Sequence, residues 1–128
     1  MDDALVIAAR AARTHAHCPY SGFAVGAALE AEDGQIFTGC NVENASYGLT
    51  LCAERAAVAA AVVSGVRRFV RLVVVAEASP PASPCGACRQ VLAEFGTDLL
   101  VESVGGGVRR SWRLAELLPD GFGPDTIR

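Results

Sequence analysis

The sequence lacks several features that mark common classes of protein. Its 128 residues carry a formal net charge of −3, so no basic field invites nucleic acid. No apolar run reaches the roughly 20 residues of a membrane helix. The N-terminus opens on Asp2 and Asp3 rather than on the basic segment of a secretory signal peptide. Without internal repeats or linkers, the chain is expected to form one domain over 1–128, in the cytoplasm, with no membrane or nucleic-acid partner.

Histidine is also scarce. It occurs only at His15 and His17, which we interpret as the frayed end of a first helix rather than as metal ligands. Cysteine, by contrast, occurs five times in a chain without an export signal, which favours reduced thiols. The composition, 52% hydrophobic and 20% charged, is ordinary for a compact domain.

Two short runs concentrate the reactive side chains. They are residues 52–55 (Cys-Ala-Glu-Arg) and 84–90 (Pro-Cys-Gly-Ala-Cys-Arg-Gln). Zinc takes four ligands in a tetrahedron, and a catalytic site leaves one position to water. Cys85 and Cys88 can reach one metal from a single turn, and Cys52 can supply a third thiolate. The spacing therefore predicts one catalytic Zn²⁺ held by these three cysteines.

Both runs are expected at the starts of helices. Thr50 is predicted as the N-cap of a helix from about residue 51, and Ser83 as the N-cap of a helix with Pro84 at its first position. All three thiols would then lie in first turns, where the helix dipole favours thiolate over thiol.

Two further residues of the first run are assigned roles. Three thiolates on a divalent cation leave a charge of about −1, and we hypothesise that Arg55 offsets it by donating hydrogen bonds to the sulfurs. Glu54 is not expected to be a ligand, because on a helix it points about 200° away from Cys52. A carboxylate bordering the same pocket, beside a metal-bound water, is suited to move protons.

These motifs resemble a known family. Cys-x-Glu at 52–54 followed by Pro-Cys-x-x-Cys at 84–88 resembles the zinc nucleoside deaminases, whose usual first ligand is histidine. Cysteine in that place is similar to the small homotetrameric cytidine deaminases of the cytidine and deoxycytidylate deaminase family, and the resemblance covers residues 19–122. It implies hydrolytic deamination of cytidine and 2′-deoxycytidine to uridine and 2′-deoxyuridine plus ammonia, in pyrimidine salvage. A zinc-activated water would react, Glu54 would shuttle protons, and each subunit of the tetramer would hold one Zn²⁺.

The resemblance also assigns substrate contacts. The Pro-Tyr-Ser-x-Phe pattern at 19–23 implies that Phe23 packs against the pyrimidine ring, although an ordinary core phenylalanine is the alternative. Asn41 and Glu43 are implied to hold the ribose 3′-hydroxyl, with a locally capped turn as the alternative. The Ala53 N–H and the Ser83 carbonyl are implied to contact the base. The other implied substrate-site residues are Val42 and, across subunit contacts, Ala45, Tyr47 and Phe122.

The pattern along the chain predicts the fold. The expected elements are a helix over 3–16 with Leu5, Ile7 and Ala8 inward, a hairpin of 24–32 and 35–39, a buried helix over 51–64, a strand over 69–76, a helix over 85–95, strands over 98–104 and 108–112, and a short helix over 113–118. This order predicts an α/β fold, a three-layer α-β-α sandwich around a mixed five-stranded sheet, as the resemblance also implies. Small residues at 25–29 should let a helix pack closely. The two metal-bearing helices are expected to follow adjacent strands.

Two other classes of function remain open. A structural zinc site or a redox module could use the Cys-x-x-Cys pair, with Cys18 or Cys40 completing a four-thiolate site. A deaminase of a nucleotide, an antibiotic, or a base in RNA or DNA would share the motif. A phosphate would want arginine or lysine near the sugar site, and residues 40–51 contain neither. A polynucleotide would want a basic groove, which the net charge disfavours.

Overall fold

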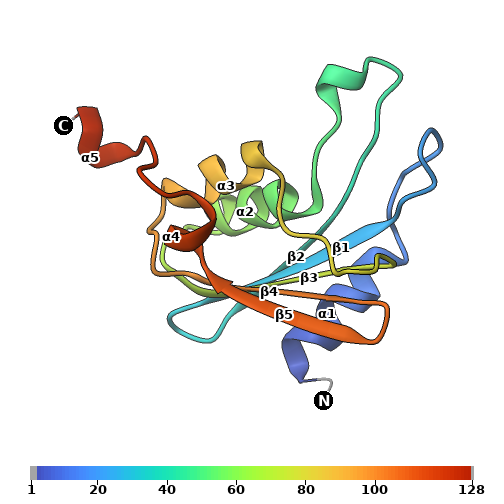
Figure 1. Ribbon diagram of the computed structural model, residues 1–128, viewed down its shortest axis with the longest axis horizontal. Helices are drawn as coiled ribbons and strands as arrows, with labels where there is room; N and C mark the ends of the chain where they lie inside the picture. The colour runs from blue at the N-terminus through green and yellow to red at the C-terminus, as the bar shows by residue number, and fades with distance from the viewer. Residues whose placement is uncertain (1–2, 128) are drawn as a thin grey trace.

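The computed structural model describes residues 3–127 as five strands and the helices that cover them (Figure 1). The elements are α1 (Ala4–Arg13), β1 (Val25–Ala31), β2 (Ile36–Cys40), the 3₁₀ helix η1 (Tyr47–Leu49), α2 (Ala53–Val63), β3 (Phe69–Ala76), α3 (Gly86–Ala93), β4 (Leu100–Gly105), β5 (Val108–Arg113), α4 (Leu114–Leu117) and α5 (Pro124–Ile127). None of the helices in this part of the chain has the length and apolarity needed to cross a bilayer.

The sheet is mixed, as predicted. Its order is β2-β1-β3-β4-β5, with β3 and β4 parallel and every other pair antiparallel. The expectation that the strands before α2 and α3 are adjacent is wrong, because β1 lies between β2 and β3. Leu29 of β1 pairs with Phe37 on one side and with Leu72 on the other, so the hairpin's first strand occupies the gap. The α2 connection therefore crosses over one strand before the chain returns as β3.

Both faces of the sheet are covered, which confirms the three-layer arrangement. Leu72 and Val74 of β3 pack with the layer that contains α2 and α3, while Val73 and Val75 pack with α1 on the opposite face. Figure 1 shows α1 on one side of the strands and α2 with α3 on the other. The continuous apolar run of β3 follows from this double burial.

The inward face of α1 differs from the prediction. The helix buries Leu5, Val6 and Ala9, whereas Ile7 is 58% exposed and Ala8 is half-buried. Successive residues turn by about 100° around a helix, so Ile7 lies some 200° from Leu5 and cannot share its face. The sequence pattern located this helix correctly but gave the wrong direction for one of its apolar side chains.

Two glycines bring the helix layers into backbone contact with the sheet. A Cβ on Gly26 would collide with the Ala9 carbonyl of α1, and a Cβ on Gly39 would collide with the Ala53 carbonyl of α2. The predicted close packing of a helix over the small residues of β1 is thus confirmed at Gly26. Gly39 has the larger functional consequence, because it fixes the height of the first turn of α2 above the sheet.

Candidate active site

Cysteines occupy the N-cap positions of the two helices that start at the site. Cys52 is the N-cap of α2 and Cys85 is the N-cap of α3, while Cys88 lies in the first turn of α3. Neither N-cap side chain accepts a helix-capping hydrogen bond. The thiols are therefore free to point toward a common centre, at the positive ends of two helix dipoles.

The predicted helix starts at Thr50 and Ser83 are wrong by two residues. Leu51 cannot begin a helix because its N–H and carbonyl pair with Val42, with two N···O distances of 2.9 Å. The Ser83 hydroxyl accepts a hydrogen bond from Arg89 instead of capping a helix. Of the three thiols predicted to lie in first turns, only that of Cys88 does, because Cys52 and Cys85 are N-caps one position before the helical residues.

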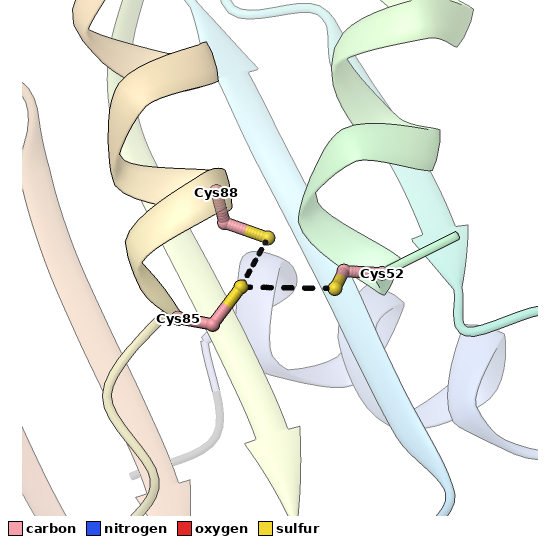
Figure 2. A group of neighbouring side chains, drawn as sticks. All are labelled: Cys52, Cys85 and Cys88. Carbon is pink, nitrogen blue, oxygen red and sulfur yellow. Dashed lines mark hydrogen bonds between the residues drawn. The ribbon is translucent and has the colours of Figure 1, made fainter. Parts of the chain in front are cut away.

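The three sulfurs converge (Figure 2). The Sγ atoms of Cys52 and Cys85 lie 3.9 Å apart, those of Cys85 and Cys88 lie 3.5 Å apart, and all three lie within 4.8 Å of one another. A zinc ion at about 2.3 Å from each sulfur in a tetrahedron places the sulfurs ~3.8 Å apart. Among the described residues this is the one group of three or more potential ligands, and neither Cys18 nor Cys40 belongs to it.

The electrostatics of the thiols call for a cation. Hydrogen bonding with Cys88 lowers the pKa of Cys52 to about 5, and the same contact raises the pKa of Cys88 above its usual range. One thiolate therefore forms easily, while a second beside it is opposed by its neighbours. A soft divalent cation removes this conflict, so the donor set fits zinc.

Glu54 lies buried beside the sulfurs. It is the second residue of α2 and only 6% exposed. Burial raises the pKa of its carboxyl, and the neighbouring Cys52 charge adds to the effect. A carboxyl whose pKa is moved toward neutrality is suited to take up and release protons at physiological pH.

Arg55 is half-buried and follows Glu54 in the first turn of α2. One terminal nitrogen donates to the Thr50 carbonyl at 2.9 Å. Its Nε is buried and has no hydrogen-bond partner among residues 3–127, yet the guanidinium is close enough to help lower the pKa of Cys52. The predicted hydrogen bonds from Arg55 to the sulfurs therefore stay a prediction, with the buried Nε as the donor that is available for them.

A cavity of about 220 Å³ opens above this cluster. Its lining consists of Phe23, Val25, Asn41, Thr50, Cys52, Ala53, Glu54, Val74, Ala82, Ser83 and Cys85. Five substrate or catalytic residues predicted from the sequence therefore meet here: Phe23, Asn41, Ala53, Glu54 and Ser83. Phe23 is 42% exposed at the cavity, so it is not an ordinary core phenylalanine.

Sequence reasoning missed the rest of the lining. Val25 and Val74 come from paired strands and form its apolar part, while Thr50 and Ala82 precede the two motifs. The proximity of Thr50 and Ala82 to Cys52 and Cys85 was the available signal. The valines carried none, because an apolar strand residue gives no sign of which end of the sheet it borders.

Asn41 and Glu43 bind the chain's own loop. The Asn41 amide accepts from the Val25 N–H at 2.9 Å and donates to the Phe23 carbonyl at 2.8 Å, which leaves one N–H and one lone pair. Glu43 accepts from the Tyr20 and Ser21 N–H groups and from the Ser21 hydroxyl, and this hydroxyl lowers the pKa of its carboxyl. Local contacts and substrate binding are therefore compatible here.

Glu43 lines a second cavity, of about 290 Å³, next to the first. Its other lining residues are Tyr20, Ser21, Tyr47 and Thr50, and Thr50 borders both cavities. Three of the predicted substrate contacts border neither cavity. Val42 is bridged to His17 and Leu51, Ala45 is exposed, and Phe122 is 57% exposed beside Gln90. Figure 1 shows the tail that carries Phe122 leading away from the body of the molecule.

Comparison with known proteins gives consistent results. The family model described as "Cytidine and deoxycytidylate deaminase zinc-binding region" matches residues 1–103. The chain is 47% identical to a cytidine deaminase of Sporosarcina psychrophila over 96% of this chain and 92% of that protein. It is 50% identical to a cytidine deaminase of Mycobacterium tuberculosis (strain ATCC 25618 / H37Rv), over 88% of this chain and 82% of that one.

The fold is similar to those of solved structures. The crystal structure of a cytidine deaminase from Burkholderia pseudomallei superposes with a TM-score of 0.90 at 51% identity, covering 93% of this chain and 97% of that one. The mixed sheet, the three converging thiols and the buried carboxylate define a zinc-dependent deaminase. The chain belongs to the cytidine and deoxycytidylate deaminase family.

Proposed function

We propose that this protein hydrolyses cytidine and 2′-deoxycytidine to uridine and 2′-deoxyuridine with release of ammonia, as a cytoplasmic enzyme of pyrimidine salvage. The observation that carries the proposal is the placement of buried Glu54 beside three convergent sulfurs, at a cavity lined by Phe23, Asn41 and Ser83. We take 1–128 as a single catalytic domain. The names of the relatives support cytidine as the nucleoside.

The proposed chemistry divides between the metal and Glu54. Cys52, Cys85 and Cys88 would hold one Zn²⁺, which supplies a Lewis acid that activates water at neutral pH. Glu54 accepts a proton from the attacking water and delivers it to ring N3, which makes C4 electrophilic. The C4–O bond forms, Glu54 carries the second proton to the exocyclic nitrogen, and the C4–N bond breaks to release ammonia. One buried carboxyl thus serves each proton transfer.

The cavities suggest how the nucleoside lies. The base would occupy the cavity of about 220 Å³, with Phe23 against the ring and the Ala53 N–H and Ser83 carbonyl at its polar edge. The sugar would extend past Thr50 toward Glu43, where Asn41 and Glu43 would hold the 3′-hydroxyl and Val42 would contribute main chain. Arg55 would donate to the sulfur of Cys52 and moderate the negative charge of the metal site.

We further propose a homotetramer with its sites at subunit contacts. Tyr47 is 74% exposed and Phe122 57% exposed in the single chain, which is unusual for large rings unless another surface covers them. Ala45 lies next to Tyr47 on the same projecting segment. These three residues would complete the site of a neighbouring subunit. Sedimentation velocity is expected to give four chains, and an active monomer would contradict this arrangement.

The decisive experiment follows cytidine absorbance after purified protein is added, with and without a chelator. Cytidine and 2′-deoxycytidine should be converted, with one ammonia per nucleoside, and the chelated protein should recover on adding Zn²⁺. Cytidine monophosphate and a cytosine-containing oligonucleotide serve as comparison substrates and should react far more slowly, because residues 40–51 offer no cation for phosphate. Faster turnover of either would assign a different deaminase activity.

A further inference from the structure

Arg89, in α3, binds both the metal-bearing loop and the chain's C-terminal segment. Its Nε donates to the Pro84 carbonyl at 2.8 Å, and one terminal nitrogen donates to the Ser83 hydroxyl at 3.0 Å. The other terminal nitrogen donates to the Leu117 carbonyl at 2.8 Å. A guanidinium is a planar fork of five donors, so it can hold three acceptors in a fixed mutual geometry.

The loop before α3 depends on this contact. Residues 79–84 contain three prolines, which have no N–H to donate. Within residues 3–127, the main chain of this loop makes two hydrogen bonds to other segments: Ala82 accepts from the Ser103 hydroxyl, and Pro84 accepts from Arg89. The Pro84 carbonyl belongs to the peptide unit that joins Cys85. Arg89 therefore fixes the approach of the chain to a metal-binding residue.

The next residue along α3 holds the tail. The Gln90 side-chain amide donates to the Phe122 carbonyl at 2.7 Å. Leu117, bound by Arg89, ends α4, so the two contacts hold the start and the end of the segment that leads to α5. Phe122 keeps its main chain anchored while its ring stays mostly exposed. Adjacent side chains of one helix thus bind the metal loop and the tail together.

We propose that Arg89 and Gln90 are positioning residues that couple the C-terminal tail to the metal loop. With Leu117 in place, the Arg89 fork is held so that Ser83 and Cys85 keep the geometry that the metal and the base require. Displacement of the tail removes one acceptor of the fork and loosens the loop on the other side. The coupling concerns the zinc site shared by the family, and its test does not depend on the proposed substrate.

The test compares Arg89→Met, Arg89→Lys and Gln90→Met with Arg67→Met, which changes an exposed arginine in the loop between α2 and β3 and serves as the matched control. The Co²⁺-loaded protein gives a visible spectrum that reports sulfur geometry without turnover. Zinc release to a chelator and amide hydrogen exchange of 79–85 and 118–127 complete the measurements. Loss of an outer contact to a ligand segment typically costs about 10–100-fold in metal affinity.

Arg89→Met should alter the Co²⁺ spectrum, speed zinc release at least about 10-fold, and raise exchange in both segments. Arg89→Lys keeps the positive charge but loses the planar fork of donors, so it should show the same changes in weaker form. If Arg89→Met does not fold, the comparison of Arg89→Lys with the wild type is the test. Gln90→Met should raise exchange in the tail and speed zinc release by a smaller factor. Arg67→Met should match the wild type.

Unchanged zinc release in folded Arg89 variants, or increased exchange in the loop with normal tail protection, would overturn the coupling. So would a Gln90→Met protein whose loosened tail leaves zinc release unaltered. These results are independent of turnover. A protein that binds zinc and shows the coupling but ignores cytidine would refute the proposed function alone.

Discussion

The two helix layers begin in opposite ways. On one face of the sheet, Asp3 caps α1 by accepting from the Leu5 and Val6 N–H groups, each at 3.1 Å. On the other face, Cys52 and Cys85 occupy the same position of α2 and α3 and cap nothing. Aspartate is among the preferred N-cap residues and cysteine is not. The α1 layer has the features of a stabilising element, whereas the α2 and α3 layer leaves its helix starts available for chemistry.

The surroundings of the helix starts differ in the same sense. Asp3 joins a network in which Arg71 and Arg109 also bind Glu102, so charges of opposite sign are matched at the start of α1. At the starts of α2 and α3 the acidic groups crowd together, and the pKa values of Cys88 and Glu54 are both raised. The difference indicates that the layer of α2 and α3 needs a bound cation to balance the charge of its acidic groups.

The strongest way to break the contrast is to give α3 an ordinary N-cap. Cys85→Ser should lose zinc and abolish deamination, while the metal-free protein becomes more stable by roughly 0.5–1 kcal/mol because serine caps the helix. Metal analysis and urea unfolding of both metal-free proteins measure the two effects. Cys18→Ser is the matched control and should retain zinc. A Cys85→Ser protein with full zinc and turnover would remove the metal assignment.

The next largest effect separates proton transfer from metal binding. Glu54→Gln should keep zinc and the fold but lower kcat/KM by more than the 10²–10⁴-fold typical of a general acid–base, because one group serves several steps. The free energy of unfolding should not fall, because burying a neutral amide does not require removing a charge from water. Steady-state kinetics on zinc-loaded protein test this, and near-normal turnover would end the shuttle proposal.

A pair of glycine substitutions sharpens the contrast between layers. Gly26→Ala and Gly39→Ala should each cost about 1–3 kcal/mol of unfolding free energy, because both place a Cβ against helix backbone. Gly39→Ala displaces the start of α2 and should also lower kcat/KM of the folded, zinc-loaded protein by about 10²-fold. Gly26→Ala, which displaces α1, should leave it within about 2-fold of wild type. Equal kinetic losses would show that the layers are not separable.

The smallest effect concerns α1 alone. A hydrogen bond from Arg71 lowers the pKa of Asp3 from 3.8 to about 2. A lowered carboxyl pKa contributes stability above pH 3.8, and this is lost as the pH falls toward 2. Because the side chain is 43% exposed, Asp3→Asn should cost at most about 1 kcal/mol at pH 7. The difference from wild type should shrink to nothing near pH 2, and deamination at pH 7 should be unchanged. A constant difference across this range would exclude the ionic origin.

The sequence predicted what depends on local pattern. The strand over 69–76 matched β3 residue for residue, because eight consecutive mostly apolar residues suit a strand buried on both faces. The metal site was found because the spacing of cysteines in the sequence limits which thiols can reach one metal ion. What failed depended on contacts that helix-start signals do not report: Leu51, which follows Thr50, pairs with Val42, and the Ser83 hydroxyl binds Arg89.

Other parts of the site could not be predicted for the same reason. That Asn41 would hold the Phe23 loop, or that Val74 would border the cavity, follows from strand pairing across the sheet rather than from neighbours in the chain. The final helix, α5, was missed because it is short, begins with proline and follows two glycines, and these residues favour turns. The roles of Ala45, Tyr47 and Phe122 rest on subunit contacts that a single chain does not contain, and these roles and that of Val42 stay predictions.

The cavity's construction sets the terms on which its selectivity can be redesigned. Its floor comes from Val25 and Val74, which are locked in the sheet between two layers of helices, whereas Thr50, Ala82 and Ser83 stand on connecting segments. Larger nucleoside analogues should therefore be accommodated by rebuilding the connecting segments and leaving the strands untouched. Libraries confined to Thr50 and Ala82 would explore substrate range with little risk to the scaffold, whereas a change at Ser83 also removes an acceptor of Arg89.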